Sequence, residues 1–152
     1  YSSLLFAALV SVIGNTLIDR LGHEMVWFRN EYIPRRTPLT HTLPRSVVWG
    51  LVSSVPVMAL VYYALPYRDF LSYALVLAID GAIVGPSHMF LDVFTERGIY
   101  VKKNGRWVRF ALAHFRYDDP GVNSAAVLAG VLMLIAAVFW LNHNIISFNV
   151  PI

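Results

Sequence analysis

Four long runs of mostly apolar residues, separated by polar segments, dominate the pattern of the chain. They cover about residues 2–21, 46–65, 69–94 and 124–141. Each run has the roughly 20 residues that a helix needs to cross a bilayer. The second and third runs are joined by a tight Pro66-Tyr67-Arg68-Asp69 turn, which is typical of an antiparallel helix pair. The pattern therefore predicts an all-α integral membrane protein, a four-transmembrane-helix bundle in which residues 1–152 form a single membrane domain.

Local features refine two of these segments. Gly81 and Gly85 stand four residues apart in the third run and suit a close contact with a neighbouring helix. Between the third and fourth runs, residues 100–110 predict a small β-hairpin, because Asn104-Gly105 is the pair that a type I′ turn favours. The aromatic and basic side chains of this hairpin suit a bilayer interface and a water-exposed face equally well.

Composition and charge support the membrane interpretation and orient it. Hydrophobic residues make up 57% of the chain and charged residues only 14%, against about 25% charged residues in soluble domains. Eleven of the twelve Lys and Arg residues lie in or next to the loops at about residues 24–45 and 96–123, and Arg68 lies on the opposite side. The positive-inside rule places both loops in the cytoplasm. We therefore expect a multi-pass protein of the cell membrane, in contact with membrane lipid, and no nucleic-acid partner for its net charge of +3.

Histidine and acidic residues gather at the predicted cytoplasmic ends of the helices. Asp19 and His23 come at the end of the first helix, and His88 and Asp92 at the end of the third. Each pair has the i, i+4 spacing that puts two side chains on one helix face, and His41 precedes the second helix on the same side. The chain has no cysteine, so imidazole and carboxylate are the ligands available for zinc, or for Mn, Fe or Ni. A single such residue is usually an interfacial cap, but two pairs in mirror order predict a shared divalent metal site, because ionisable groups in membrane helices are costly.

Other polar residues have weaker assignments. Asn15 and Asp80 are expected to support the site from behind or to make structural hydrogen bonds, and Arg36 and Arg45 could hold a substrate phosphate. Turn and capping chemistry explains the polar group before the fourth helix better than metal ligation does. Its members are His114, Asp118, Asp119, Asn123 and Ser124, the last two as candidate N-caps.

Three stretches resemble the motifs of a known family. They are residues 18–23 (IDRLGH), 34–42 (PRRTPLTHT) and 87–98 (SHMFLDVFTERG). The second is similar to the H-R-G-x-T-H-S motif of the membrane-bound metal-dependent hydrolases, the third to their S-H-L-x-L-D-x-x-T-x-x-G motif, and the first to their acidic motif. These are small inner-membrane proteins, one bacterial member of which is named as binding the LexA repressor, and an archaeal branch of uncharacterised function also resembles this chain. The chain departs from the pattern at Arg35, where the family often has histidine, and at Asn15, where it commonly has a second acid.

Two functions fit these residues. The first is an integral-membrane metal-dependent hydrolase at the cytoplasmic interface, acting on a lipid ester or phosphoester. Its metal ligands would be His23, His41 and His88, with Asp19 and Asp92 as the catalytic residues, one a fourth ligand and the other a water-orienting base. The alternative is a non-catalytic membrane protein whose structural metal ties the helices together while its loops dock a partner. An ion carrier, to which Asp80 would point, is disfavoured because the ligands lie at one end of the bundle and make no path.

Overall fold

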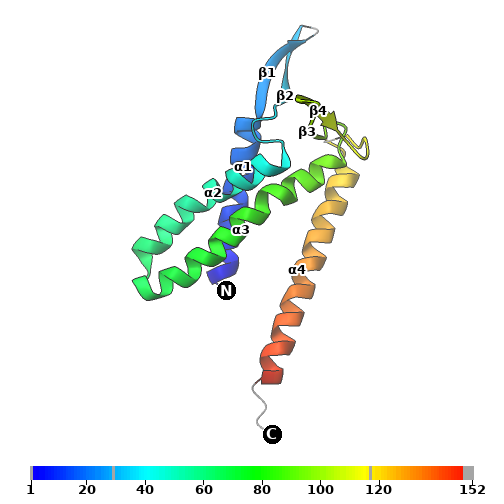
Figure 1. The fold of residues 1–152 in the computed structure, drawn as a ribbon. Coiled ribbons are helices and arrows are strands. Elements are labelled where there is room, and N and C mark those ends of the chain that lie inside the picture. The colour runs from blue at the N-terminus through cyan, green and yellow to red at the C-terminus, as the bar shows by residue number, and fades with distance from the viewer. Residues whose placement is uncertain (1, 29, 117, 149–152) are drawn as a thin grey trace. The chain divides into compact units, whose positions relative to one another are not determined.

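The computed structural model describes residues 2–28, 30–116 and 118–148, and these are mostly helical. The elements follow one another as α1 (Ser2–Gly22), β1 (His23–Phe28), β2 (Glu31–Arg36), α2 (Leu43–Ala64), α3 (Tyr67–Val93), β3 (Ile99–Lys103), β4 (Arg106–Phe110) and α4 (Pro120–Phe148) (Figure 1). The chain divides into two compact units, Tyr1–His114 and Phe115–Ile152. The first unit contains three helices and two β-hairpins, and the second contains α4.

Four helices of the described residues are long and apolar enough to cross a membrane, as the sequence predicts. The candidate spans are Leu4–Gly22, Leu43–Ala64, Asp69–Val93 and Pro120–Trp140. The start of α4 differs from the prediction. Asp119, and not Asn123 or Ser124, caps this helix, because its Oδ1 accepts hydrogen bonds from the backbone N–H groups of Gly121 and Val122 and Pro120 suits the first helical position.

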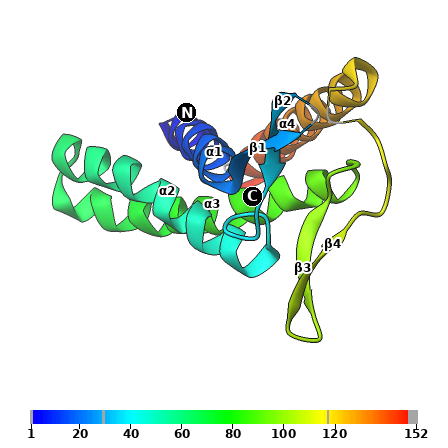
Figure 2. The same cartoon turned by 90° about the horizontal axis from the view of Figure 1, so that it is seen from above.

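The three helices of the first unit pack around small residues. Figures 1 and 2 show α2 and α3 running side by side. Gly81 and Gly85 lie against the backbone of α2, where a Cβ atom would collide with the carbonyl oxygens of Gly50 and Ser46. The predicted close helix contact at these two glycines is therefore confirmed. Hydrophobic side chains complete the interior in two clusters, namely Val10, Val57, Val61 and Leu77, and Ile18, Met89 and Ile99.

Two antiparallel hairpins stand at one end of this unit. The predicted hairpin is present as β3 and β4, and its turn residues Asn104 and Gly105 have φ values of 50° and 77°, as a type I′ turn requires. The hairpin of β1 and β2, in which His23 pairs with Arg36, was not predicted. Its second strand contains Pro34, which lowers the expectation of a strand, but a two-stranded ribbon consists of edges, where proline is tolerated.

Candidate metal centre

The first unit brings the end of α1, the start of α2 and the end of α3 together. His41 lies just before α2, and its segment is held on both sides by backbone hydrogen bonds. Thr37 donates its N–H to the carbonyl of Gly22 at 2.7 Å, and Tyr100 donates to the carbonyl of His41, also at 2.7 Å. The absence of a side chain at Gly22 matters here, because a Cβ atom would collide with Thr40 and with the His41 imidazole. The chain between α1 and α2 therefore places His41 directly over the last turn of α1.

Two imidazoles and two carboxylates face one another at this end. Nε2 of His88 lies 3.4 Å from Oδ1 of Asp19 and 3.4 Å from Oδ2 of Asp92. Nε2 of His41 lies 3.7 Å from each of the same two oxygens. A tetrahedral ion with bonds of about 2.0–2.1 Å holds its ligand atoms about 3.3–3.4 Å apart. The two separations from His88 match this spacing, and the two from His41 are longer. His41, His88 and Asp92 are thus close to the spacing that one small divalent ion requires.

Three of these donor atoms are buried and make no hydrogen bond. Among the described residues, Nε2 of His41, Nε2 of His88 and Oδ2 of Asp92 are inaccessible to solvent and accept or donate no hydrogen bond. The ligand atoms of these three residues all lie within 4.8 Å of one another. A buried polar atom left unpaired costs roughly 1–3 kcal/mol, and native structures keep such atoms rare. A shared cation would account for all three at once.

Hydrogen bonds behind the imidazoles set their tautomers. The Thr40 hydroxyl donates to the carbonyl of Ile18 at 2.8 Å, so its oxygen accepts the Nδ1–H of His41 at 2.9 Å. Nδ1 of His88 lies 2.9 Å from the amide oxygen of Asn15, which is an acceptor. Both rings thus carry a proton on Nδ1, and these bonds direct Nε2 of each ring into the cluster, which is the orientation of metal-binding histidines.

Burial keeps the His41 ring neutral. Its side chain is fully buried, and desolvation lowers the pKa of His41 below its ordinary value, with a further lowering from the positive Arg36. The negative charges of Asp19 and Asp92 oppose this change without reversing its direction. Neutral imidazole is the form that binds a metal ion.

Arg36 holds Asp92 from the outer side. Its Nη2 donates to Oδ1 of Asp92 at 2.6 Å, and both side chains are only 10% exposed. Nη1 donates to Oγ1 of Thr95 at 3.2 Å and to the carbonyl of Gly98 at 2.9 Å. Burial lowers the pKa of Arg36 from its ordinary value, as does the neighbouring Arg97, while Asp92 raises it. The ion pair leaves Oδ2 of Asp92 directed to the imidazoles.

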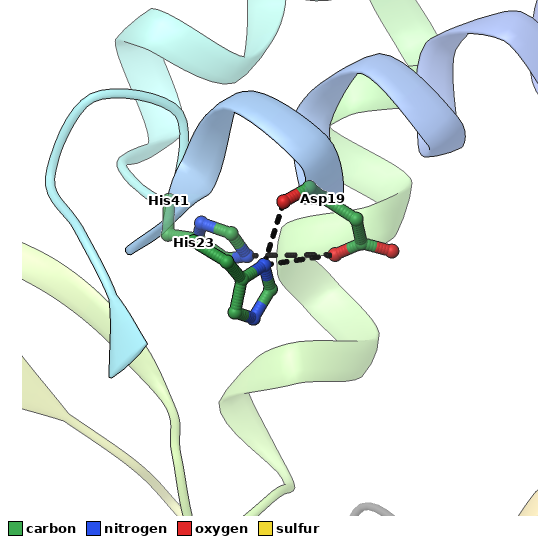
Figure 3. Close-up of side chains that lie close together, drawn as sticks. All are labelled: Asp19, His23 and His41. Carbon is green, nitrogen blue, oxygen red and sulfur yellow. Dashed lines mark hydrogen bonds and ion pairs between the residues drawn. The ribbon is translucent and has the colours of Figure 1, made fainter. Parts of the chain in front are cut away.

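His23 occupies a different position from the other two histidines. Its Nδ1 lies 2.7 Å from the backbone carbonyl of Asp19, to which it donates, and 3.9 Å from Oδ1 of that residue. Figure 3 shows these contacts, with the rings of His23 and His41 beside the Asp19 carboxylate. Asp19, His23 and His41 also have ligand atoms within 4.8 Å of one another. The bond to the carbonyl occupies Nδ1, so His23 is at the edge of the cluster and not among the four facing donors.

The cluster opens on the side of Asp19. The side chain of Asp19 is 50% exposed, whereas His41 and His88 are 0% and 13% exposed. Thr40, Asn15 and Arg36 hold the buried donors from behind. Asp19 is therefore the most accessible of the four donors.

The other residues singled out from the sequence lie elsewhere. Arg45 donates to the carbonyl of Pro38 at 2.8 Å and lies over the ring of Trp107. Arg35 pairs with Glu24 at 3.8 Å. Asp80 is half-buried in α3, with one carboxylate oxygen that has no partner among the described residues. Of the two arginines predicted to hold a substrate phosphate, Arg36 contacts Asp92 of the centre and Arg45 contacts Pro38 and Trp107, and their phosphate-binding role stays a prediction. The sequence alone does not predict the roles of Thr40, Thr95 and Gly22. For Thr40, its position directly before His41 was the available signal.

Comparison with known proteins identifies a family. A family model described as "Protein of unknown function (DUF1286)" matches residues 1–91, more than half of the chain, and the chain belongs to this family. The match includes Asp19, His23, His41 and His88 and ends next to Asp92. No curated protein and no solved structure matches the chain. The geometry of the centre is therefore the basis for inferring the function.

Proposed function

We propose that this protein is an integral-membrane metal-dependent hydrolase whose ion, zinc, is bound by His41, His88 and Asp92, with Asp19 at the opening. The observation that carries the proposal is the convergence of buried donor atoms that have no other partner. Two imidazole nitrogens and a carboxylate oxygen are the donor set of many catalytic zinc sites. The hydrogen bonds behind the rings support the same assignment, because metal-binding histidines usually donate their second N–H.

The residues of the chain have separate tasks in this proposal. A divalent ion bound here would lower the pKa of a water ligand to about 7 and polarise the bond to be cleaved. Thr40 and Asn15 keep the lone pairs of the two imidazoles directed inward. Arg36 holds Asp92 in place through their ion pair. Asp19, half exposed at the opening, accepts the proton of the attacking water.

The exposure of Asp19 favours catalysis over a purely structural metal. A structural site has four fixed protein ligands, whereas a catalytic site keeps a position open to water. Three donors are held from behind, and Asp19 is 50% exposed. With an ion held by the three buried donors, Asp19 would be the carboxylate placed to take a proton from a water molecule beside it.

The position of the centre indicates the substrate. The donors come from the last turns of two candidate spans and from the segment just before a third, which is the level of lipid headgroups when these helices cross a membrane. The basic loops on this side favour the cytoplasmic face of the cell membrane. A lipid ester or phosphoester is the substrate class that reaches such a position.

The first test removes ligands from the purified, metal-loaded protein. His88→Ala and Asp92→Ala should abolish cleavage of short-chain ester and phosphoester lipids, because loss of a ligand disrupts activation of the water. His114→Ala and Asp69→Ala remove the same residue types outside the cluster and should retain activity. Size-exclusion profiles identical to that of the parent protein would show that the variants remain folded.

A second variant separates catalysis from the structural alternative. Asp19→Asn should keep the metal on the three buried donors and lose at least about 100-fold in turnover, the usual contribution of a general base. The alternative, a structural metal in a protein that docks a partner, predicts a different result. The parent protein would then cleave no lipid, and ligand variants would show a sharply lower melting temperature, since metal binding energy is folding energy in such a site.

A further inference from the structure

A basic cleft adjoins the candidate metal centre on its outer side. It has a volume of about 550 Å³ and lies within the first unit, where residues of both hairpins line it. Four arginines contribute to its walls, namely Arg35, Arg36, Arg97 and Arg109. Tyr100 and Ile33 are among the remaining lining residues. Positions far apart in the chain thus place four guanidinium groups around one space.

Two of the four guanidinium groups pair with carboxylates that lie outside the lining of the cleft. Arg36 is paired with Asp92, and Arg35 is paired with Glu24 at 3.8 Å in an exposed position. The residues that line the cleft include no Asp or Glu within the described part of the chain. Like charges at close range repel one another and attract an anion, so a space lined by four arginines and by no acidic residue suits an anionic group.

Arg36 connects the cleft to the metal centre. Its side chain is 90% buried, since only 10% is exposed, and two of its nitrogens are bonded to protein oxygens. Its Nε is buried and has no hydrogen-bond partner among the described residues. One guanidinium thus contacts Asp92 at the centre and also lines the cleft, so a group bound in the cleft lies next to the donors of the metal.

We propose that this cleft binds a terminal, doubly charged phosphate group, and that it selects substrates of the proposed hydrolase that carry a phosphate monoester. Several guanidinium forks suit the multiple oxygens and double charge of a phosphate better than the single carboxylate of a peptide. The apolar side chains beside the arginines, such as Ile33, suit a phosphate that is attached to a lipid. The substrate role rests on the proposed function, whereas binding in the cleft does not need the metal.

The test measures binding by the full chain in a maltoside detergent, with chelator present, so that the metal centre cannot contribute. The probes are dihexanoyl phosphatidic acid, inorganic phosphate and dihexanoyl phosphatidylcholine. Isothermal titration calorimetry measures the affinity of the protein for each of them. Phosphatidic acid should bind at least about tenfold more tightly than phosphatidylcholine, whose headgroup has no net charge. Tighter binding of phosphatidic acid than of inorganic phosphate identifies a lipid as the source of the phosphate, and equal binding identifies free phosphate.

Matched variants assign the binding to the cleft. Arg97→Gln combined with Arg109→Gln should weaken binding of phosphatidic acid by about tenfold or more, because two charge-assisted contacts are lost. Arg106→Gln and Lys103→Gln remove two charges from the hairpin that carries Arg109, at positions outside the cleft lining, and should change affinity less than about twofold. Equal binding of all three probes, or equal losses in the two pairs of variants, would overturn the proposal. Phosphate binding without any hydrolysis would leave the cleft assignment standing and reject the proposed enzyme.

Discussion

Two buried threonines flank His41, and only one of them contacts the imidazole. Thr40 is 0% exposed and accepts the Nδ1–H of His41 while it donates to the carbonyl of Ile18. Thr42 is 1% exposed, and its hydroxyl oxygen has no hydrogen-bond partner among the described residues. The two threonines are equally buried, but only the Thr40 hydroxyl is hydrogen-bonded to His41, so Thr42 is a matched control for Thr40.

Thr40→Val should weaken metal binding by about 10- to 100-fold, the usual effect of losing a hydrogen bond behind a metal-binding histidine. The ring of His41 would lose the acceptor that fixes its tautomer. Thr42→Val changes shape in the same way and should leave the affinity unaltered. Competition with a zinc-chelating dye measures both variants, and equal affinities would show that Thr40 does not orient His41.

The sequence predicts which residue types meet at the centre, but not how they are held. The i, i+4 spacing of Asp19 with His23 and of His88 with Asp92 indicates shared helix faces, and the structure brings these residues together with His41. Their metal-binding roles remain predictions. The contacts of Arg36 with Asp92 and with Gly98 span more than fifty positions of the chain. A local sequence pattern cannot predict contacts between residues so far apart in the chain.

At the level of elements, the contact between α2 and α3 depends on glycine. Gly85→Ala places a methyl group against the backbone carbonyl of Ser46, which cannot move without separating the helices. We expect a loss of stability of about 1–3 kcal/mol, the usual cost of overpacking. Thermal unfolding in detergent measures this loss.

The control for this substitution is Gly130→Ala in α4. Among the described residues, a Cβ atom at Gly130 would meet nothing within 4 Å, and alanine favours helix more than glycine does. Its melting temperature should equal or exceed that of the parent protein. Gly85→Ala melting at the parent temperature would contradict the close contact.

The two hairpins show what a local pattern can predict about elements. Asn104-Gly105 has a turn signature of its own, and the hairpin of β3 and β4 was predicted from it. The turn between β1 and β2 includes Asn30 at a φ of 67° and no glycine. Its strands are also stabilised at their base by the bond from Thr37 to Gly22, which is tertiary information. The sequence therefore predicts only the hairpin of β3 and β4, whose turn residues are sufficient to identify it.

For the whole molecule, the distribution of basic residues predicts the orientation in the membrane. The chain has no cysteine, so single cysteines can be introduced without a background. With an impermeant maleimide applied to intact cells, Arg68→Cys should react and Lys103→Cys should react only after permeabilisation. Labelling of Lys103→Cys alone would reverse the orientation and place the metal centre outside the cytoplasm.

The central claim is that the buried donors of the first unit share a metal ion, and the metal content of the purified protein tests it most directly. Elemental analysis of the full chain, purified in detergent without chelator and dialysed against trace zinc, should find at least about one divalent ion per chain. His41→Ala should lose this ion, and His114→Ala should retain it. Less than about a tenth of an ion per chain, or equal metal content in His41→Ala and the parent protein, would contradict the account, because a site with these ligands binds zinc tightly at neutral pH.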